Sequence, residues 1–401
     1  MISVDEARER ILRDLRATPP ETVALAEAWG RVTSAPIVAR RTQPPHDVSA
    51  MDGYALRAAD GALGAKLRVI GTAPAGHPFD GTIGPGETVR IFTGSVVPAG
   101  ADTILLQEDT ERAGDTVTVT EAVAANRHIR VAGLDFSEGD DIIQAGRRLT
   151  VRDIGLAAAA NHPWIDVHRA PRVAILATGD EISMPGEPIG PGGIVSSNSH
   201  ALAALVRAQG GVPIVLPIAR DERAAIARAG EQARGADLLV TTGGVSVGDH
   251  DLVRDVLGGE GMTLDFWQIA MRPGKPLMSG RLGDVPVVGL PGNPVSTVVC
   301  GAIFIVPALR RLSGLPADPP ATETALLGAA VKPNDKRLEY MRATLTTDAQ
   351  GRTIATPFPL QDSSMTRVLA QADALVVRPA FNPGMAPGDP VAIIRLGVMG
   401  L

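Results

Sequence analysis

The sequence predicts a multidomain protein of α/β plus β class, with a central doubly wound α/β domain between two β-rich parts. Apolar strands alternate with helices from residue 173 onward, which is typical of a parallel sheet covered on both faces. Short β-rich runs separated by Gly and Pro turns fill residues 37–128, and short strands return after Pro319. The length of 401 residues fits about two to four domains of the usual size.

The N-terminal part has helical ends and a β-rich middle. An amphipathic helix is predicted at the start and ends at Pro19-Pro20; its apolar positions, at helical spacing, are Val4, Ala7, Ile11 and Leu15. The predicted strands are 67–70, 88–92, 103–107 and 116–120, and an Ala-rich helix covers 151–160. We therefore expect residues 1–40 and 136–171 to form a discontinuous helical domain, into which a β-rich domain of residues 41–135 is inserted.

The central and C-terminal parts follow two further patterns. Between residues 172 and 317 the predicted strands are 173–177, 212–216 and 237–241, and the predicted helices are 199–209, 221–234, 251–257 and 295–312. These units predict the doubly wound domain. Residues 318–401, with strands at 337–345 and 374–378, predict a small C-terminal β-barrel.

Composition excludes several classes of protein. The formal charge of -6, from 44 acidic and 38 basic residues, gives no support for a nucleic-acid binder. Cys300 is the single cysteine, so an intrachain disulfide is excluded, and the seven histidines show no metal-ligand spacing. The start of the chain has alternating charges unlike a signal peptide, and the longest apolar run, 295–309, is shorter than the ~20 residues of a membrane span. We expect a cytoplasmic protein without a membrane partner.

Three Gly-rich or turn-prone loops follow strands of the central domain, at 178–181, 241–251 and 290–296. Ligands of open α/β sheets bind outside the carboxyl ends of the strands, and backbone N–H groups at helix N-termini favour phosphate. Asp249 and Asp251 offer oxygen ligands suited to Mg²⁺. For any one loop the glycines could equally be turn residues, and Asp249 an N-cap. Three such loops on one edge favour an anionic ligand such as a nucleotide or a pterin phosphate.

With the loops Thr178-Gly179-Asp180-Glu181, Gly243–Asp249 and Leu290–Ser296 in this order, the central domain resembles the molybdopterin-binding domain. That domain occurs in molybdopterin adenylyltransferases and molybdenumtransferases. Upstream, Ser49–Ala55, Arg90–Gly94 and Gln107-Glu108 resemble signatures of the molybdenumtransferase branch alone. The chain thus resembles the molybdopterin molybdenumtransferase family over essentially its whole length.

The resemblance implies an enzyme that inserts molybdate into adenylylated molybdopterin. AMP is released with the help of Mg²⁺, and the dithiolene sulfurs take up the molybdenum. The resemblance also implies a homodimer whose active site lies between the central domain of one subunit and the N-terminal β domain of the other. Molybdopterin adenylyltransferase and proteins that mature molybdoenzymes are the implied protein partners.

Site residues carry over from the family residue by residue. The implied catalytic residues are Asp52, Thr93, Glu181 and Asp251, with Asp52 and Thr93 supplied by the partner chain. The implied metal ligands are Asp135, Glu181, Asp221 and Asp251. The implied substrate-binding residues are Gly179, Asp180, Gly243, Gly244, Ser246, Gly248, Asp249, Arg272, Lys275, Pro291, Gly292, Asn293, Arg342 and Ser363.

Several of these residues have a structural alternative. Asp52 could shape a turn, Asp221 could be a helix N-cap, Asp135 could be merely solvated, and Arg342 could be an exposed strand cation. Glu181 has no evident structural use. The chain also departs from the family pattern: Val48 stands where the family usually has Asn, Ser196 where it has Asp, and Gln268 and Arg272 where it often has Lys.

Two other functions compete with the leading one. The central loops alone would also fit adenylyl transfer to molybdopterin, although the residues beyond one domain, about 250 by the usual domain size, speak against it as the main activity. A non-catalytic scaffold is the third hypothesis, because the fold resembles the corresponding domain of gephyrin, which anchors receptors. Retention of the acidic residues argues against pure scaffolding.

Overall fold

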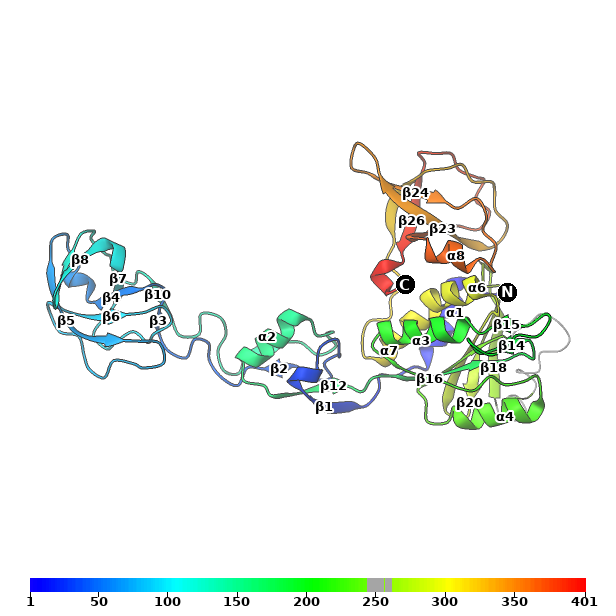
Figure 1. Cartoon of the computed structure of the whole chain (residues 1–401), viewed down its shortest axis with the longest axis horizontal. Helices are drawn as coiled ribbons and strands as arrows, with labels where there is room; N and C mark the ends of the chain where they lie inside the picture. The colour runs from blue at the N-terminus through cyan, green and yellow to red at the C-terminus, as the bar shows by residue number, and fades with distance from the viewer. Residues whose placement is uncertain (244–255, 257–261) are drawn as a thin grey trace.

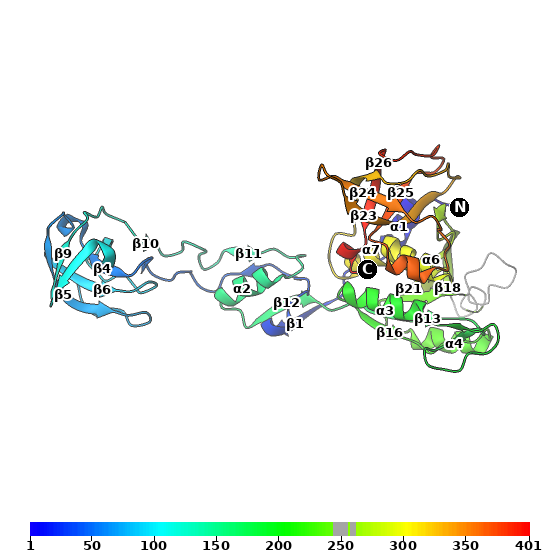
Figure 2. The same ribbon diagram turned by 45° about the horizontal axis from the view of Figure 1, so that its top comes forward.

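The computed structural model describes residues 1–243, 256 and 262–401. The molecule is elongated, with a β domain at one end, a narrow arm in the middle, and a larger body at the other end (Figures 1 and 2). The body contains the central α/β domain and the C-terminal barrel, so the predicted multidomain class with a central α/β domain is confirmed. Of the predicted helix at 251–257, all residues except 256 lie outside the described residues.

The β domain at the far end is a six-stranded sheet in the order β7-β4-β6-β5-β9-β8. Its strands are β4 (Gly53–Leu56), β5 (Lys66–Ala73), β6 (Glu87–Ile91), β7 (Thr103–Leu106), β8 (Thr110–Ala113) and β9 (Thr116–Val119). Short strands β3 (Val48–Ser49) and β10 (Ile129–Arg130) pair beside it, and single turns η2 (Ala58–Asp60) and η3 (Gln107–Asp109) connect strands. Val89, Ile91 and Ile104 pack on one core face. The four predicted strands of this segment overlap β5, β6, β7 and β9, although β5 extends to Ala73, beyond the predicted end at residue 70.

The arm holds less helix than expected. Its α-helix is α2 (Val151–Ala159), which begins with a capping box between Thr150 and Asp153. The remaining elements are β1 (Pro20–Ala24), η1 (Leu25–Glu27), β2 (Ile37–Val38), β11 (Asp141–Ile143) and β12 (Trp164–His168). β1 pairs with β12 and β2 with β11, so two antiparallel ribbons join chain segments distant in sequence.

The central sheet has the order β16-β13-β17-β21-β20-β18, and its first four strands run parallel. The strands are β13 (Arg172–Ala177), β16 (Val212–Val215), β17 (Leu238–Thr242), β18 (Met262–Gln268), β20 (Pro276–Leu282) and β21 (Val285–Leu290). Side chains of β13 alternate between two cores: Val173 and Ile175 face α3 (Asn198–Ala208), while Ala174 and Leu176 face α4 (Arg223–Gln232). A strand buried on both faces explains the continuous apolar run in the sequence.

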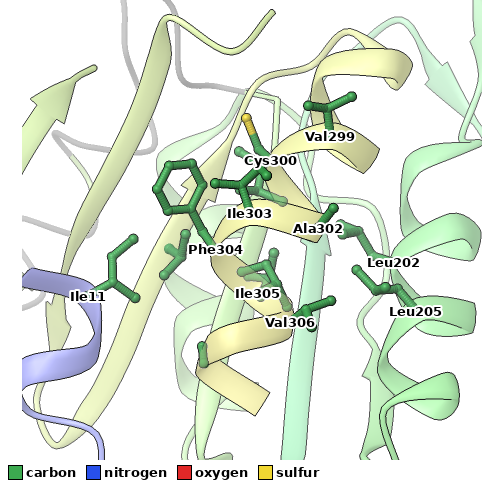
Figure 3. Close-up of a cluster of buried hydrophobic side chains, with 14 of the residues drawn as sticks. Ile11, Leu202, Leu205, Val299, Cys300, Ala302, Ile303, Phe304, Ile305 and Val306 are labelled. Atoms are coloured by element: carbon green, nitrogen blue, oxygen red, sulfur yellow. The ribbon is translucent and has the colours of Figure 1, made fainter. Parts of the chain in front are cut away.

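The first helix, α1 (Val4–Arg13), packs in the body rather than in the arm. We expected this helix to form one domain with residues 136–171. Its apolar stripe is instead buried against the last helices of the central domain. Figure 3 shows Ile11 of α1 on one side of Phe304, with Leu202 and Leu205 of α3 beyond it. Amphipathicity predicts that a helix buries one face, but it does not name the surface that covers that face.

The closing helix of the central domain is interrupted. It consists of α6 (Pro294–Cys300), a π-helical turn η4 (Gly301–Ile305) and α7 (Val306–Leu312). By length and composition alone, Pro294–Leu312 could cross a membrane, but 83% of its apolar window is buried inside the protein. A core helix can be as long and as apolar as a membrane span. Because this helix is mostly buried, it belongs to the hydrophobic core in Figure 3.

The C-terminal region is a closed five-stranded barrel, as predicted. Its strands are β22 (Glu323–Leu327), β23 (Leu338–Thr347), β24 (Thr353–Pro357), β25 (Ala374–Arg378) and β26 (Pro390–Arg395). Pairing runs β22-β24-β23-β25-β26 and back to β22. The short helices α8 (Thr366–Ala370) and η5 (Gly397–Met399) flank it. The central segment β19 (Met271–Arg272) also pairs with β23, so this strand joins the two domains of the body.

Candidate functional site

A cavity of about 1210 Å³ opens at the carboxyl ends of β13, β17 and β21. Its walls come from the loops after these strands, from residues 272–276, and from Arg337 and residues 361–366 of the C-terminal region. Most of the residues that line the cavity have polar or charged side chains, unlike the residues of the apolar cores. It occupies the position where open α/β sheets bind ligands.

The floor of the cavity requires glycine. Gly243 has φ of +86°, and a β-carbon there would lie 2.6 Å from the carbonyl oxygen of Thr178. Gly292 packs against this floor, since its own β-carbon would lie 3.5 Å from the Cα of Gly243. The loops after β13, β17 and β21 therefore meet backbone to backbone, and glycine permits the approach.

Asn198 ties two of these loops together. Its Nδ2 donates to Oγ1 of Thr242 at 2.8 Å and to the carbonyl oxygen of Gly292 at 2.7 Å. Asn198 begins α3, which follows two short parallel strands, β14 (Ile182–Ser183) and β15 (Ile194–Val195). Asn198 is not among the residues predicted from the sequence, where the polar run at 196–198 before a helix was the available signal.

One side of the cavity is acidic. Glu181 folds back over Gly179, where a β-carbon would lie 2.6 Å from Oε2 of Glu181. Asp221 lines the same cavity, and its backbone N–H donates to Oδ1 of Asp180 at 3.1 Å. Burial, and then the nearby charges of Asp180 and Glu181, raise the pKa of Asp221. The three carboxylates thus repel one another.

Asp221 does not cap a helix. The N-cap position of α4 is Glu222, which makes no side-chain capping bond. The alternative that Asp221 serves as an N-cap is therefore wrong, and its carboxylate is left facing the cavity.

Cations lie towards the other end of the sheet, because residues 272–275 connect β18 and β20, whereas Glu181 and Asp221 follow β13 and β16. This side of the cavity is the basic wall. Arg272 and Lys275 line the cavity, as the resemblance implies, and Arg337 joins them. Arg337 donates three hydrogen bonds to the carboxylate of Asp335, at 2.5 to 3.1 Å.

Ser363 reaches the cavity through a contact between domains. Nδ2 of Asn293 donates to Oγ of Ser363 at 2.8 Å, and the N–H of Val295 donates to the carbonyl oxygen of Ser363 at 3.0 Å. These bonds dock the barrel loop 361–366 on the start of α6. Asn293, Pro291 and Gly292 also line the cavity.

Arg342 is buried, with 2% of its surface exposed, and lies behind the cavity wall. Its backbone N–H and its Nε donate to Oε1 of Gln361, at 3.0 and 3.3 Å, and Gln361 itself lines the cavity. Among the described residues no carboxylate lies within salt-bridge distance of Arg342. Burial lowers its pKa and Asp362 partly opposes this. Arg342 is therefore not an exposed strand cation.

Three predicted residues lie away from the cavity of their own chain. Asp52 and Thr93 lie in the β domain at the far end of the molecule, where Thr93 donates two hydrogen bonds to Asp52. Asp135 is exposed in the connection between β10 and β11. Next to Asp52, the guanidinium of Arg90 stacks 5.0 to 5.1 Å from the ring centres of Phe92 and Tyr54.

The predicted residues on the loop after β17 are only partly described. Gly243 lines the cavity, whereas Gly244, Ser246, Gly248, Asp249 and Asp251 lie outside the described residues. The sequence motifs did not predict four residues that line the cavity, namely Asn198, Thr242, Arg337 and Gln361. Gln361 belongs to the loop that carries Ser363. Side chains from the barrel reach the cavity by docking of one domain on another, which no local pattern reveals.

Fold and site together define a class of protein. An open α/β sheet with a glycine floor, an acidic wall and a basic wall at its carboxyl edge binds a phosphorylated or otherwise anionic ligand. A β-barrel completes the site in this chain.

Comparisons with known proteins identify the family. Residues 2–161 match the MoeA N-terminal region (domain I and II), residues 174–311 the probable molybdopterin binding domain, and residues 324–396 the MoeA C-terminal region (domain IV). Molybdopterin molybdenumtransferase 2 of Mycobacterium tuberculosis (strain H37Rv) is 38% identical over 98% of this chain and 99% of its own. The corresponding protein of Haemophilus influenzae is 32% identical over 98% of each chain.

A solved structure has the same fold. The molybdopterin biosynthesis MoeA protein of Pyrococcus horikoshii superimposes with a TM-score of 0.84, at 28% identity, over 98% of this chain and 100% of its own. The chain belongs to the molybdopterin molybdenumtransferase (MoeA) family.

Proposed function

We propose that this protein inserts molybdate into adenylylated molybdopterin and releases AMP with the help of Mg²⁺. The observation that carries the proposal is the division of one cavity into an acidic wall, with Glu181 and Asp221, and a basic wall, with Arg272 and Lys275. A pyrophosphate with its metal ion needs carboxylates, which the acidic wall supplies, and an oxyanion needs cations, which the basic wall supplies. Family membership supports the same reaction.

The donor set fits Mg²⁺. Glu181 and Asp221 offer carboxylate oxygens, which Mg²⁺ prefers. Burial and then repulsion by Asp180 and Glu181 raise the pKa of Asp221, and a divalent cation relieves such repulsion. The described residues contain no cluster of three or more side-chain ligands at coordinating distance. Mg²⁺ commonly takes one or two carboxylates and completes its shell with water and substrate phosphate, so two ligands suffice. When bound, Mg²⁺ would neutralise the charge of the pyrophosphate; Asp251 and Asp135 remain proposed further ligands.

The glycine floor would hold the phosphorylated ligand. Gly179, Gly243 and Gly292 bring backbone to the cavity surface, and Asn293 stands beside them just before α6. Asp180 positions the N–H of Asp221 and so orders the acidic wall. Ser246, Gly248 and Asp249 are proposed to complete the floor.

The basic wall would bind molybdate. Arg272 offers a planar fork and Lys275 a point charge, both of which suit a tetrahedral dianion. Behind them, Arg342 is a buried cation that no described carboxylate pairs with at salt-bridge distance, and a buried charge is costly unless it is paired. An oxyanion placed beside Gln361 and Ser363 would supply the missing negative charge.

The remaining catalytic residues would come from a second subunit. Asp52 and Thr93 lie on a domain that the arm holds away from the cavity of its own chain. We propose a homodimer in which this domain closes over the cavity of the partner. The protein would work in the cytoplasm, where it would receive its substrate from an adenylyltransferase and pass its product to maturation proteins.

The test uses Glu181→Gln, which keeps the shape of the side chain and removes its charge. Purified protein is incubated with adenylylated molybdopterin and molybdate, and AMP release is followed against Mg²⁺ concentration. We expect a loss of about 10²-fold or more, which corresponds to about 3 kcal/mol of barrier. Binding of the adenylylated pterin without metal should stay nearly unchanged.

Glu187→Gln is the matched control, because Glu187 is close in sequence and exposed, and lies outside the cavity lining. It should release AMP at the parent rate. Parent-like turnover of Glu181→Gln with the same Mg²⁺ dependence would contradict the catalytic role. Pyrophosphate release from molybdopterin and MgATP would instead favour adenylyl transfer as the activity.

A further inference from the structure

A barrel carboxylate lies directly behind one cation of the cavity. β19 and β23 pair in parallel with Arg272 opposite Glu339, so a residue of the central domain and a residue of the barrel are strand neighbours. Oε1 of Glu339 lies 3.7 Å from Nη1 of Arg272. Glu339 does not line the cavity, whereas Arg272 does.

The other oxygen of Glu339 is held from inside the barrel. Oε2 accepts a hydrogen bond from Nη1 of Arg378 at 2.7 Å, and both side chains are almost completely buried, with 9% and 3% exposed. Arg378 in turn donates to the carbonyl oxygen of Lys332 and to Oδ1 of Asn382. The Glu339 carboxylate is therefore fixed in place, because a buried ion pair with further hydrogen bonds has few alternative positions.

The charges of this group leave Arg272 available to an anion. Arg378 already neutralises Glu339, so the three side chains together keep one positive charge, and that charge lies on the exposed member. The Arg272 side chain is 54% exposed, and 3.7 Å is an electrostatic contact longer than a hydrogen bond. Arg272 is thus held in direction, and its N–H donors make no hydrogen bond to the described residues, so they can bind a ligand in the cavity.

We propose that Glu339 is a positioning residue, which with Arg378 orients the guanidinium of Arg272 toward an oxyanion in the cavity. Through Glu339 the barrel then raises the affinity for the anion, although Glu339 itself does not contact the anion. The proposal rests on the proposed function where it takes molybdate to be that oxyanion. A flexible side chain with four rotatable bonds loses less entropy on binding when a neighbour already restricts it.

The test is a double-mutant cycle on Glu339→Gln and Arg272→Gln, with the dissociation constant of molybdate measured by calorimetry on the full-length protein. Glu339→Gln should weaken binding about tenfold, which lies within the range of coupling between contacting residues. In the Arg272→Gln background the same change should have an effect of less than about twofold. A purely structural role would weaken binding equally in both backgrounds, and that result would overturn the proposal.

Two further variants guard against misfolding. Glu339→Asp keeps the charge beside Arg378 but shortens the side chain, so it should fold and still weaken binding. Glu323→Gln is the matched control, because Glu323 pairs with Arg395 on the surface of the same barrel, away from the cavity. It should bind molybdate like the parent. Parent-like binding by a folded Glu339→Asp together with a folded Glu339→Gln would also overturn the proposal.

The cycle is repeated with inorganic phosphate as the probe. If the parent binds phosphate but no molybdate, the proposed function fails, and the phosphate cycle alone decides the role of Glu339. If the parent binds molybdate and the coupling is absent for both anions, only the positioning role fails.

Discussion

Oδ1 of Asp52 accepts two hydrogen bonds from Thr93, one from the backbone N–H and one from Oγ1, each 2.8 Å long. The backbone bond and then the hydroxyl bond lower the pKa of Asp52; burial opposes them, and the charge of Arg90 adds a smaller lowering. Hydrogen bonds to a carboxylate favour its charged form. Asp52 is thereby kept ionised and oriented on the surface of the β domain, so it does more than shape a turn before Gly53.

Thr93→Val should raise the pKa of Asp52, because the hydroxyl donor is lost while the backbone N–H remains. If ionised Asp52 is needed for AMP release, the acidic limb of the pH–rate profile moves to higher pH. The pKa itself is read by NMR titration of the labelled carboxyl carbon. Thr116→Val, at an exposed position of β9 in the same domain, should leave both quantities unchanged. An unshifted Asp52 titration would show that the hydroxyl contributes nothing to the ionisation.

Subunits with complementary defects should restore activity if the site is shared between two chains. Asp52→Ala and Glu181→Ala are each expected to be nearly inactive alone. Random mixing makes half of the dimers mixed, and each mixed dimer has one intact site of two, so about a quarter of the parent activity should return. A monomeric parent protein with full activity would exclude the composite site.

Asn198→Leu should loosen the cavity floor. The change removes two hydrogen bonds and leaves the buried hydroxyl of Thr242 without this partner, which costs about 1–3 kcal/mol. We expect lower stability in denaturant and weaker binding of molybdopterin. Asn126→Gly, at an exposed position with φ of +63°, is the control and should bind like the parent. Unchanged ligand affinity of Asn198→Leu would mean that the loops hold their arrangement without it.

Asp153→Asn should destabilise the arm in a pH-dependent way. Burial opposes ionisation of this carboxyl, but hydrogen bonds from Thr150 and then from Arg147 outweigh burial and lower its pKa. A carboxyl with a lowered pKa stabilises the folded state at pH values above its unfolded pKa, and this contribution is lost as pH falls through the folded pKa. The variant should lose about 1–2 kcal/mol near pH 7 and less in acid.

Thermal or denaturant unfolding of both proteins at neutral and acidic pH measures this difference. A gap between parent and Asp153→Asn that stays constant across the pH range would attribute the effect to packing instead of charge.

The predictable part of the fold depended on local pattern. The strand at 374–378 was predicted with the bounds that the structure shows, β13 begins one residue earlier than predicted, and β17 is shifted by one residue at both ends. Alternation of apolar residues and turn-forming Gly and Pro act over a few residues, so these elements could be derived from the chain alone. The three loops that follow predicted strands then predicted a ligand site at the carboxyl edge of the parallel sheet, where the cavity lies.

Contacts between distant segments could not be derived in this way. Nothing in residues 4–13 shows that α1 packs against Phe304, and nothing around Glu339 shows that it lies behind Arg272. Residues 136–171 were also expected to be mainly helical. Strands in this segment instead pair with partners more than a hundred residues away.

The sequence by itself determined strands such as β13, β17 and β25 and the positions of the three loops of the site along the chain, because each depends on residues that are neighbours in the chain. The tertiary structure alone decided which charges face one another. Docking of the barrel on α6 brings Ser363 to the cavity and buries Arg342 behind Gln361, while the arm carries Asp52 and Thr93 away from it. Electrostatic interactions depend on distance in space and on burial, and both are set only when separate domains pack.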